Sequence, residues 1–143
     1  MIVPDANILL YAWDSSSALH SPAKAWVEAS FSSGDQVGIA WQNIAAFLRI
    51  VTNPRLLAHR FTMHEAVGVV ESWLDQPAVT ILTPGEQHWR LLRDILFQSQ
   101  VVGPDVTDAQ LAALTIEYGG TLYTTDRGFA RFPGLRWANP LNP

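Results

Sequence analysis

The chain has 143 residues, of which 48% are hydrophobic and 15% charged, and this composition predicts a single soluble globular domain over residues 1–143 rather than a disordered chain. No apolar run reaches the roughly 18 residues that a membrane-spanning helix needs, and no signal peptide is apparent, so we expect a cytoplasmic protein without membrane contacts. The absence of cysteine excludes disulfides, thiolate zinc sites and cysteine nucleophiles, while a formal net charge of −4 argues weakly against a general nucleic-acid binder.

Short apolar runs alternate with stretches of helical periodicity along the whole chain. The apolar runs predict strands at residues 2–5, 37–40, 79–82 and 121–124, with a fifth, edge strand at 135–137. Helices are predicted at residues 7–13, 22–30 and 41–51, and three more are predicted to begin near residues 63, 84 and 108. Strands that alternate with helices indicate an α/β fold, namely a three-layer α/β/α sandwich with a mostly parallel central sheet.

Several predicted helices carry starting signals. In a capping box, a Ser or Thr side chain and an acidic or amide side chain three residues later satisfy free backbone N–H groups. Such boxes are predicted at 62–65, 83–86 and 107–110, and Pro22 and Pro84 are predicted at the first helical position. The apolar residues expected to face the core from these helices are Ile44, Phe47, Leu48, Val51, Val67, Val70, Trp73, Leu74, Trp89, Leu92, Ile95, Leu96, Leu111, Leu114 and Tyr118.

Three aspartates lie at the ends of predicted elements, although they are far apart in the sequence. Asp5 ends the first strand, Asp126 follows the fourth, and Asp108 stands at a predicted helix start. Each one taken alone is accounted for as a helix N-cap, for which Asp is a preferred residue. The carboxyl ends of parallel strands face the ligand crevice, so the three aspartates together predict one acidic pocket.

The acidic pocket has a chemical consequence. Carboxylates that share a pocket repel one another and raise each other's pKa unless a cation lies among them. Oxygen ligands without cysteine or a histidine pair favour Mg²⁺, or Mn²⁺, over zinc. We therefore predict that Asp5, Asp108 and Asp126 are the metal ligands, directly or through water, and the catalytic residues. A metal held in this way activates water and stabilises the leaving oxygen of a phosphodiester.

Two polar residues stand beside these acids in the sequence. Asn7 is predicted either to orient a carboxylate or a water molecule, or only to begin a helix. Thr124 is predicted either to donate a hydrogen bond to a metal ligand or to phosphate, or only to favour a strand.

Basic residues are concentrated in two segments without acids, one between Asp35 and Glu65 and the other after Asp126. An Arg rim around a metal-filled acidic pocket suits a phosphodiester backbone, although two solvated surface patches would give the same pattern. The basic residues of the two segments are Arg49, Arg55, His59, Arg60, His64, Arg127, Arg131 and Arg136.

Several segments in order carry a family resemblance. They are the opening strand with Asp-Ala-Asn at 5–7, Phe-Leu-Arg-Ile-Val-Thr-Asn-Pro-Arg at 47–55, Val-Thr-Asp-Ala-Gln-Leu at 106–111 and Thr-Thr-Asp-Arg-Gly-Phe at 124–129. With the closing Phe-Pro-Gly-Leu-Arg-Trp at 132–137, the chain resembles a PIN-domain ribonuclease and, more narrowly, the VapC toxins of VapBC toxin–antitoxin modules.

The resemblance implies a Mg²⁺-dependent endoribonuclease toxin, usually a homodimer, inhibited by a cognate antitoxin whose C-terminal segment occupies the active-site groove. Asp5, Asp108 and Asp126 match the family's metal-site acids. The implied substrate is structured RNA, with transfer RNA and ribosomal RNA both consistent with the resemblance. Candidate RNA contacts are Arg127 and Arg131, and the head of Arg49 is expected to reach a carboxylate or a backbone phosphate while its stem packs.

One position departs from the family pattern. Many PIN domains carry a Glu immediately before the Phe-Leu-Arg phrase, where this chain has Ala46. Losing that acid is expected to weaken metal binding without removing the site, because Mg²⁺ accepts water in place of a ligand. Asp105 and Glu117 are the candidates to compensate, and for Glu117, which lies further along the same predicted helix, a surface role is favoured.

Three alternatives remain at the level of sequence. The first is a PIN-like module that binds RNA or antitoxin without cutting, because of Ala46. The second is a phosphatase of the haloacid-dehalogenase type, which needs a second Asp where this chain has Asn7. The third is a phosphoacceptor signalling domain, whose acidic pair and Lys are not in the expected places.

Overall fold

The computed structural model describes residues 1–57 and 60–142, so His59, one of the basic residues singled out above, lies outside the described residues. Its centre is a five-stranded sheet in the order β3-β2-β1-β4-β5, in which neighbouring strands are parallel. The predicted α/β class is confirmed. The strands are β1 (Ile2–Pro4), β2 (Val37–Ala40), β3 (Val79–Leu82), β4 (Thr121–Tyr123) and β5 (Trp137–Ala138).

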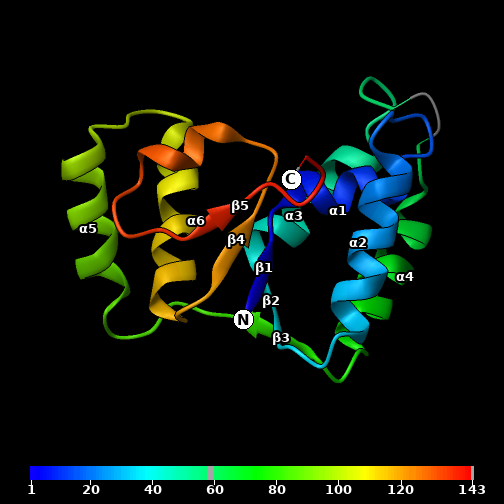
Figure 1. The fold of residues 1–143 in the computed structure, drawn as a ribbon. Helices are drawn as coiled ribbons and strands as arrows, with labels where there is room; N and C mark the ends of the chain where they lie inside the picture. Colours follow the sequence, from blue (N-terminus) through cyan, green and yellow to red (C-terminus); the bar gives the residue numbers. More distant parts are fainter. Residues whose placement is uncertain (58–59, 143) are drawn as a thin grey trace.

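Helices cover both faces of this sheet, which confirms the three-layer sandwich (Figure 1). One face is covered by α1 (Ala6–Trp13), α2 (His20–Ser32), α3 (Trp41–Val51) and α4 (Met63–Leu74). The other is covered by α5 (His88–Ser99), α6 (Asp105–Glu117) and the short 3₁₀ helix η1 (Arg127–Arg131). None of the helices in the described ranges is long and apolar enough to cross a membrane.

The order of the strands agrees with right-handed crossovers. From β1 through β2 to β3 the chain moves toward one edge of the sheet, and its connecting helices α1 to α4 lie on one face. After β3 it returns past β1 to β4 and β5, with α5, α6 and η1 on the opposite face. The direction therefore reverses between β1 and β4, and a crevice opens outside the carboxyl ends of these strands, where open α/β sheets bind ligands.

Side chains of the central strands alternate between the two helical layers. Val37 of β2 is buried against α1 to α4, whereas Val3 of β1 is buried against α5, α6 and η1. Helices α3 and α4 meet through Phe47 and Trp73, whose ring centres lie 4.6 Å apart. Each fully buried side chain of this size contributes about 1.5–3 kcal/mol, so the two apolar clusters fix the helices on the sheet.

Some predicted boundaries are those of the structure. The predicted elements at residues 37–40, 41–51 and 79–82 coincide with β2, α3 and β3. The capping box before α4 is also confirmed, because the Glu65 N–H donates to Thr62 Oγ1 at 3.1 Å and the Thr62 N–H donates to Glu65 Oε1 at 3.1 Å. By contrast, β5 occupies 137–138 rather than the predicted 135–137.

Two predicted proline starts are wrong. Helix α2 begins at His20 after an N-cap without a side-chain hydrogen bond, so Pro22 stands in the third helical position. Helix α5 begins at His88 instead of Pro84. The reason lies in a distant residue: Glu117 of α6 accepts a hydrogen bond from the Gly85 N–H at 2.9 Å, which holds the predicted first turn in an open loop.

The third predicted box, at 107–110, is also wrong. Helix α6 begins at Asp105, and the Thr107 hydroxyl donates to the Pro104 carbonyl at 2.8 Å instead of capping a helix. Asp108 therefore lies at the fourth position of α6, within its first turn, and not at its first position.

The inward faces of two helices were also predicted in part wrongly. Val67 is 39% exposed, Leu74 is 37% exposed and Trp89 is 66% exposed. In their place Ala66 of α4 and His88 of α5 are buried. Helix α5 covers the outer side of the second layer, so only one narrow stripe of it meets the core (Figure 1).

Candidate active site

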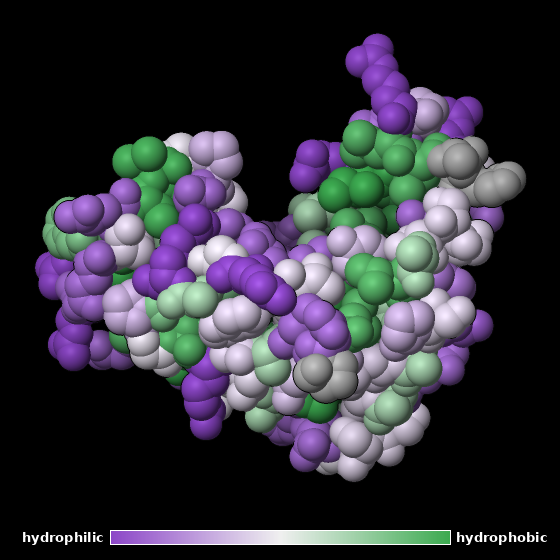
Figure 2. Space-filling model, turned by 45° about the horizontal axis from the view of Figure 1, so that its top comes forward, coloured by the Kyte–Doolittle hydropathy of each residue, from purple (hydrophilic) through white to green (hydrophobic). Residues whose placement is uncertain are grey.

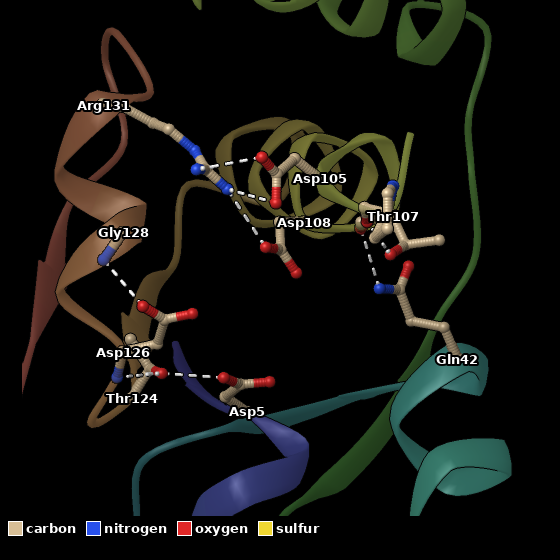
Figure 3. Close-up of polar contacts among 10 residues, drawn as sticks. Asp5, Gln42, Asp105, Thr107, Asp108, Thr124, Asp126, Gly128 and Arg131 are labelled. Atoms are coloured by element: carbon tan, nitrogen blue, oxygen red, sulfur yellow. Dashed lines mark hydrogen bonds and ion pairs between the residues drawn. The ribbon is translucent and has the colours of Figure 1, made fainter. Parts of the chain in front are cut away.

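The three aspartates lie around one space at the carboxyl edge of the sheet. Figure 3 shows the carboxylates of Asp5, Asp108 and Asp126 pointing into this space from β1, α6 and the segment after β4. The sequence prediction that three distant acids gather at the sheet edge thus agrees with the structure. The reversal of the chain between β1 and β4 explains it, since Asp5 and Asp126 follow the two strands that flank the crevice.

Asp5 is fixed by the start of α1. It is the N-cap of that helix, and its Oδ1 accepts a hydrogen bond from the Ala6 N–H at 2.7 Å. Its other oxygen, Oδ2, accepts from the Thr124 hydroxyl at 2.7 Å. The N-cap role predicted for Asp5 is thus confirmed, and the same carboxylate also accepts from Thr124 across the crevice.

Thr124 joins the two strands of the crevice. Its side chain is fully buried, and besides donating to Asp5 it accepts hydrogen bonds from Asn7 Nδ2 at 3.1 Å and from the Asp126 N–H at 3.0 Å. Asn7 lies in the first turn of α1, as its second alternative predicts, and contacts the hydroxyl that holds Asp5 instead of a carboxylate itself. Of the polar atoms of Asn7, Oδ1 is buried without a partner among the described residues.

Asp126 and Asp108 are more open to solvent. Asp126 is the N-cap of η1, and its Oδ1 accepts from the Gly128 N–H at 2.7 Å. Asp108 presents its Oδ2 to Arg131 at 3.2 Å. The other oxygens, Asp126 Oδ2 and Asp108 Oδ1, accept no hydrogen bond within the part of the chain that the structure describes.

Burial, and to a smaller extent neighbouring acids, disfavour the charged forms of Asp5 and Asp108. Burial raises the pKa of Asp5, the hydrogen bonds from Thr124 and Ala6 oppose that rise, and the carboxylate of Asp126 adds to it. Burial is also the main cause that raises the pKa of Asp108; Asp126 and Asp5 raise it further, while Arg131 lowers it. The ionised carboxylates are thus destabilised in the folded protein, and a cation among them would relieve this.

A groove of about 390 Å³ opens beside Asp5 and Asp108. Ala46 lines it, so no carboxylate stands at the position where the family pattern has Glu. Gln42, one turn earlier, also lines the groove and donates to the Thr107 carbonyl at 3.0 Å (Figure 3). Its neighbour Asn43 is buried and donates to the Pro4 carbonyl at 2.9 Å, which is a structural contact. In Figure 2 the surface is hollowed between two lobes of the molecule.

The predicted basic residues take different places. Arg49 lines the groove from α3, and Arg131 contacts acids of α6. Arg127 is exposed at the first position of η1. Arg136 donates to the Gly119 carbonyl, which ties it to the end of α6 and away from the groove.

The donor set fits a hard divalent cation with water in its coordination shell. Within residues 1–57 and 60–142, no group of three or more His, Asp or Glu side chains is gathered closely enough to enclose an ion by itself. Mg²⁺ usually takes only one or two protein carboxylates and keeps several waters. Asp5 and Asp108, whose pKa values burial and the nearby Asp126 carboxylate raise, are therefore suited to hold Mg²⁺ together with Asp126, partly through water.

Two features of this region were missed or wrongly predicted. The ion pairs of Arg131 with Asp105 and Asp108 were missed, because the partners are more than 20 residues apart and no local pattern links them. Glu117 has a structural role and not the surface role predicted for it: its Oε2 lies 3.2 Å from His88 Nδ1, and its side chain is only 14% exposed.

Comparison with known proteins was made on the sequence and on the fold. The family model of the PIN domain matches residues 2–135. Ribonuclease VapC33 of Mycobacterium tuberculosis is 37% identical over 141 residues, which cover 99% of each chain. Ribonuclease VapC37 of the same organism is 34% identical over 140 residues, covering 98% of this chain and 97% of the relative.

Solved structures share the fold at low sequence identity. VapBC2 of Rickettsia felis, bound to a DNA fragment from its promoter, matches with a TM-score of 0.71 and 17% identity, covering 97% of this chain and 98% of that chain. VapC20 of Mycobacterium tuberculosis, described as a toxin that cleaves the sarcin–ricin loop, matches with a TM-score of 0.67 and 16% identity, covering 95% and 99% of the two chains.

Proposed function

Because the chain belongs to the PIN-domain family, we propose that it is a Mg²⁺-dependent endoribonuclease, the toxin of a toxin–antitoxin pair. The observation that carries this proposal is the convergence of the Asp5, Asp108 and Asp126 carboxylates on one space at the β1–β4 crevice. Curated relatives named ribonuclease VapC, at 34–37% identity over nearly the whole chain, support the reaction class. The phosphatase and phosphoacceptor alternatives have no such support.

The residues at the site have different roles in the proposed phosphodiester hydrolysis. Asp5, held at both oxygens, and the more open Asp108 and Asp126 would hold the cation, with Mn²⁺ able to replace Mg²⁺. When bound, such an ion supplies activation of water and stabilises the leaving oxygen. Thr124 orients the Asp5 carboxylate and favours its ionised form against the effect of burial, since its hydroxyl donates to it.

The basic residues provide contacts to the RNA backbone. Arg49 lines the groove, and Arg127 and Arg131 stand on the η1 side of it. Phosphate contacts of this kind position a nucleic acid without reading its sequence. We propose that they align structured RNA, transfer RNA or ribosomal RNA, so that one phosphodiester lies over Asp5, Asp108 and Asp126.

The proposal includes two protein partners in the cytoplasm. Solved VapBC assemblies with this fold support a cognate antitoxin, and a homodimer follows from the family resemblance. An apolar hollow of about 350 Å³ between α1, α2 and α4, lined by Trp13, Val27, Phe31 and Trp73 among others, provides surface that a protein partner can cover.

The first experiment uses the purified full chain, free of antitoxin, with labelled total RNA and either Mg²⁺ or Mn²⁺. We expect cleavage that EDTA abolishes and that Asp5→Asn abolishes. Asn is also a good N-cap, so this variant removes the charge and keeps the start of α1. The Asn side chain has one acceptor oxygen, so it keeps only one of the hydrogen bonds from the Ala6 N–H and the Thr124 hydroxyl, and thermal unfolding of the variant is measured beside cleavage to show that it is folded.

The matched control is Asp35→Asn, which removes a carboxylate from the exposed turn before β2 and should cut RNA like the wild type. Equal cleavage by the wild type and Asp5→Asn would rule out the site. A folded wild type that binds RNA and Mn²⁺ but does not cut would favour the alternative of a PIN-like binding module, for which Ala46 is the specific observation.

A further inference from the structure

Arg131 contacts the acidic groove directly. Its Nη2 lies 3.2 Å from Asp108 Oδ2 and 3.3 Å from Asp105 Oδ1, and its Nη1 donates to Asp105 Oδ2 at 3.4 Å (Figure 3). The guanidinium therefore holds Asp105 through both of its oxygens and Asp108 through one. The two acids lie one turn apart on α6, so a single side chain reaches both.

The guanidinium of Arg131 also packs on an aromatic ring. Its central carbon lies 5.0 Å from the ring centre of Phe132, which is only 3% exposed and packs against Phe129. A cation over an aromatic face is attracted to it, so the buried ring confines the Arg131 head to the rim of the groove. The same short segment carries Asp126 at its start, so η1 brings one acid and one cation to the groove together.

This arrangement conflicts with a metal ion at Asp108. The Oδ2 atom that accepts from Arg131 belongs to a carboxylate that we assign to the metal. A divalent ion and a guanidinium on one carboxylate repel each other at short range, so the two compete for Asp108. Asp105 is not assigned to the metal, so it can keep Arg131 when a cation binds. It contacts Arg131 through both oxygens, and its side chain is 47% exposed.

We propose that Arg131 is a positioning residue: it is the counter-ion of Asp108 in the metal-free protein, and it yields Asp108 to the divalent cation while staying on Asp105, with its remaining N–H groups turned to the RNA backbone. This inference depends on the metal-dependent function proposed above. It links metal binding to RNA binding, since the Arg131 guanidinium that leaves Asp108 becomes a contact to an RNA phosphate. It also accounts for how the neighbouring acids Asp105 and Asp108 are kept together before metal arrives.

The test is the affinity for Mn²⁺ in the absence of RNA, measured from the electron paramagnetic resonance signal of the free ion. Arg131→Gln removes the competing charge and should bind Mn²⁺ about tenfold more tightly than the wild type, since a unit charge beside a divalent ion is worth roughly a factor of ten even in water-like surroundings. Arg131→Lys keeps the charge and should stay close to the wild type. Arg90→Gln, an exposed position of α5, is the matched control and should not change the affinity.

A double-mutant cycle tests the role of Asp105. If Asp105 acts by retaining Arg131, Asp105→Asn should weaken Mn²⁺ binding in the wild type and have little effect in the Arg131→Gln background. In the presence of metal, at times too short for cleavage, Arg131→Gln should also reduce the slope of log Kobs for RNA against log salt by about 0.7.

The outcomes separate this inference from the proposed function. A wild type that binds Mn²⁺ and cuts RNA, with Arg131→Gln binding Mn²⁺ equally or more weakly, would overturn the inference and leave the function standing. A wild type that binds no Mn²⁺ at millimolar concentration would overturn both. If Arg131→Gln does not fold, the wild type is compared with Asp105→Asn alone. Equal Mn²⁺ affinity of these two proteins would then overturn the inference.

Discussion

The hydroxyl of Thr124 is the smallest group on which the geometry of the groove depends. Thr124→Val removes it and keeps the branched shape of the side chain at a fully buried position. Three hydrogen bonds meet at this oxygen, at 2.7 Å to Asp5, 3.1 Å to Asn7 and 3.0 Å to the Asp126 N–H. Each is worth about 0.5–1.5 kcal/mol net, and the partners left behind are at least partly buried, so we expect a loss of about 2–4 kcal/mol of unfolding free energy.

The assay is urea unfolding of the metal-free protein, with thermal unfolding beside it. With an unfolding entropy of about 2 cal/mol/K per residue, the expected loss corresponds to a decrease of the midpoint temperature by about 7–13 °C. RNA cleavage should fall strongly as well, because the Asp5 carboxylate loses the donor that orients it. Thr125→Val is the matched control: the neighbouring threonine is half-buried and has no side-chain hydrogen bond within the described ranges, so its loss should be below about 1 kcal/mol.

The effect of Thr124→Val should depend on pH with a defined sign. The hydrogen bond from Thr124 lowers the pKa of Asp5 against the larger effect of burial, so its removal raises that pKa further. A carboxyl whose folded pKa lies above its unfolded pKa disfavours folding once it is ionised. The stability difference between wild type and variant should therefore be smallest at acidic pH and grow as the pH rises through the raised pKa. Equal losses for Thr124→Val and Thr125→Val, or a difference that shrinks with rising pH, would refute this reasoning.

Other positions give simpler predictions. Ala46→Glu adds a carboxylate to the groove and should tighten Mn²⁺ binding by about tenfold, measured by titration of the metal. Glu117→Ala removes the acceptor shared by Gly85 and His88, so urea unfolding should show a loss of about 2–3 kcal/mol while the folded variant still cuts RNA. Gly38→Ala would place a Cβ 2.7 Å from a buried Leu82 methyl and should lose about 1–3 kcal/mol, whereas Gly68→Ala meets open space on α4 and should gain about 0.5–1 kcal/mol.

Each of these has a control and a contradicting result. Ala29→Glu on the exposed side of α2 should leave Mn²⁺ binding unchanged, and a null effect of Ala46→Glu would mean that α3 does not face the metal. Glu71→Ala, at an exposed position of α4, should change stability by less than about 0.5 kcal/mol, and a loss equal to that of Glu117→Ala would argue against the α5–α6 contact. A stabilised Gly38→Ala would show that β2 and β3 are packed more loosely than the structure has them.

Local patterns were enough for a large part of this protein. The apolar run at residues 37–40, which follows a turn, was enough to predict β2. The helical spacing of Ile44, Phe47 and Val51 was enough to predict α3 and its buried face. Both signals come from neighbours in the chain, which is the range over which periodicity and turn chemistry act. The gathering of Asp5, Asp108 and Asp126 could also be predicted, because parallel strands bring their carboxyl ends to one edge whatever lies between them.

Contacts between distant residues decided the rest. The 83–86 segment has the pattern of a capping box, yet Glu117, 32 residues later, takes the Gly85 N–H and keeps the segment open. In the same way Arg131 reaches Asp108 across 23 residues and changes what that acid can bind. Sequence alone thus determined the elements and the edge at which the acids meet, since those depend on local spacing. Only the tertiary structure decided which donor each carboxylate takes, because that choice depends on which side chains folding brings within hydrogen-bonding distance.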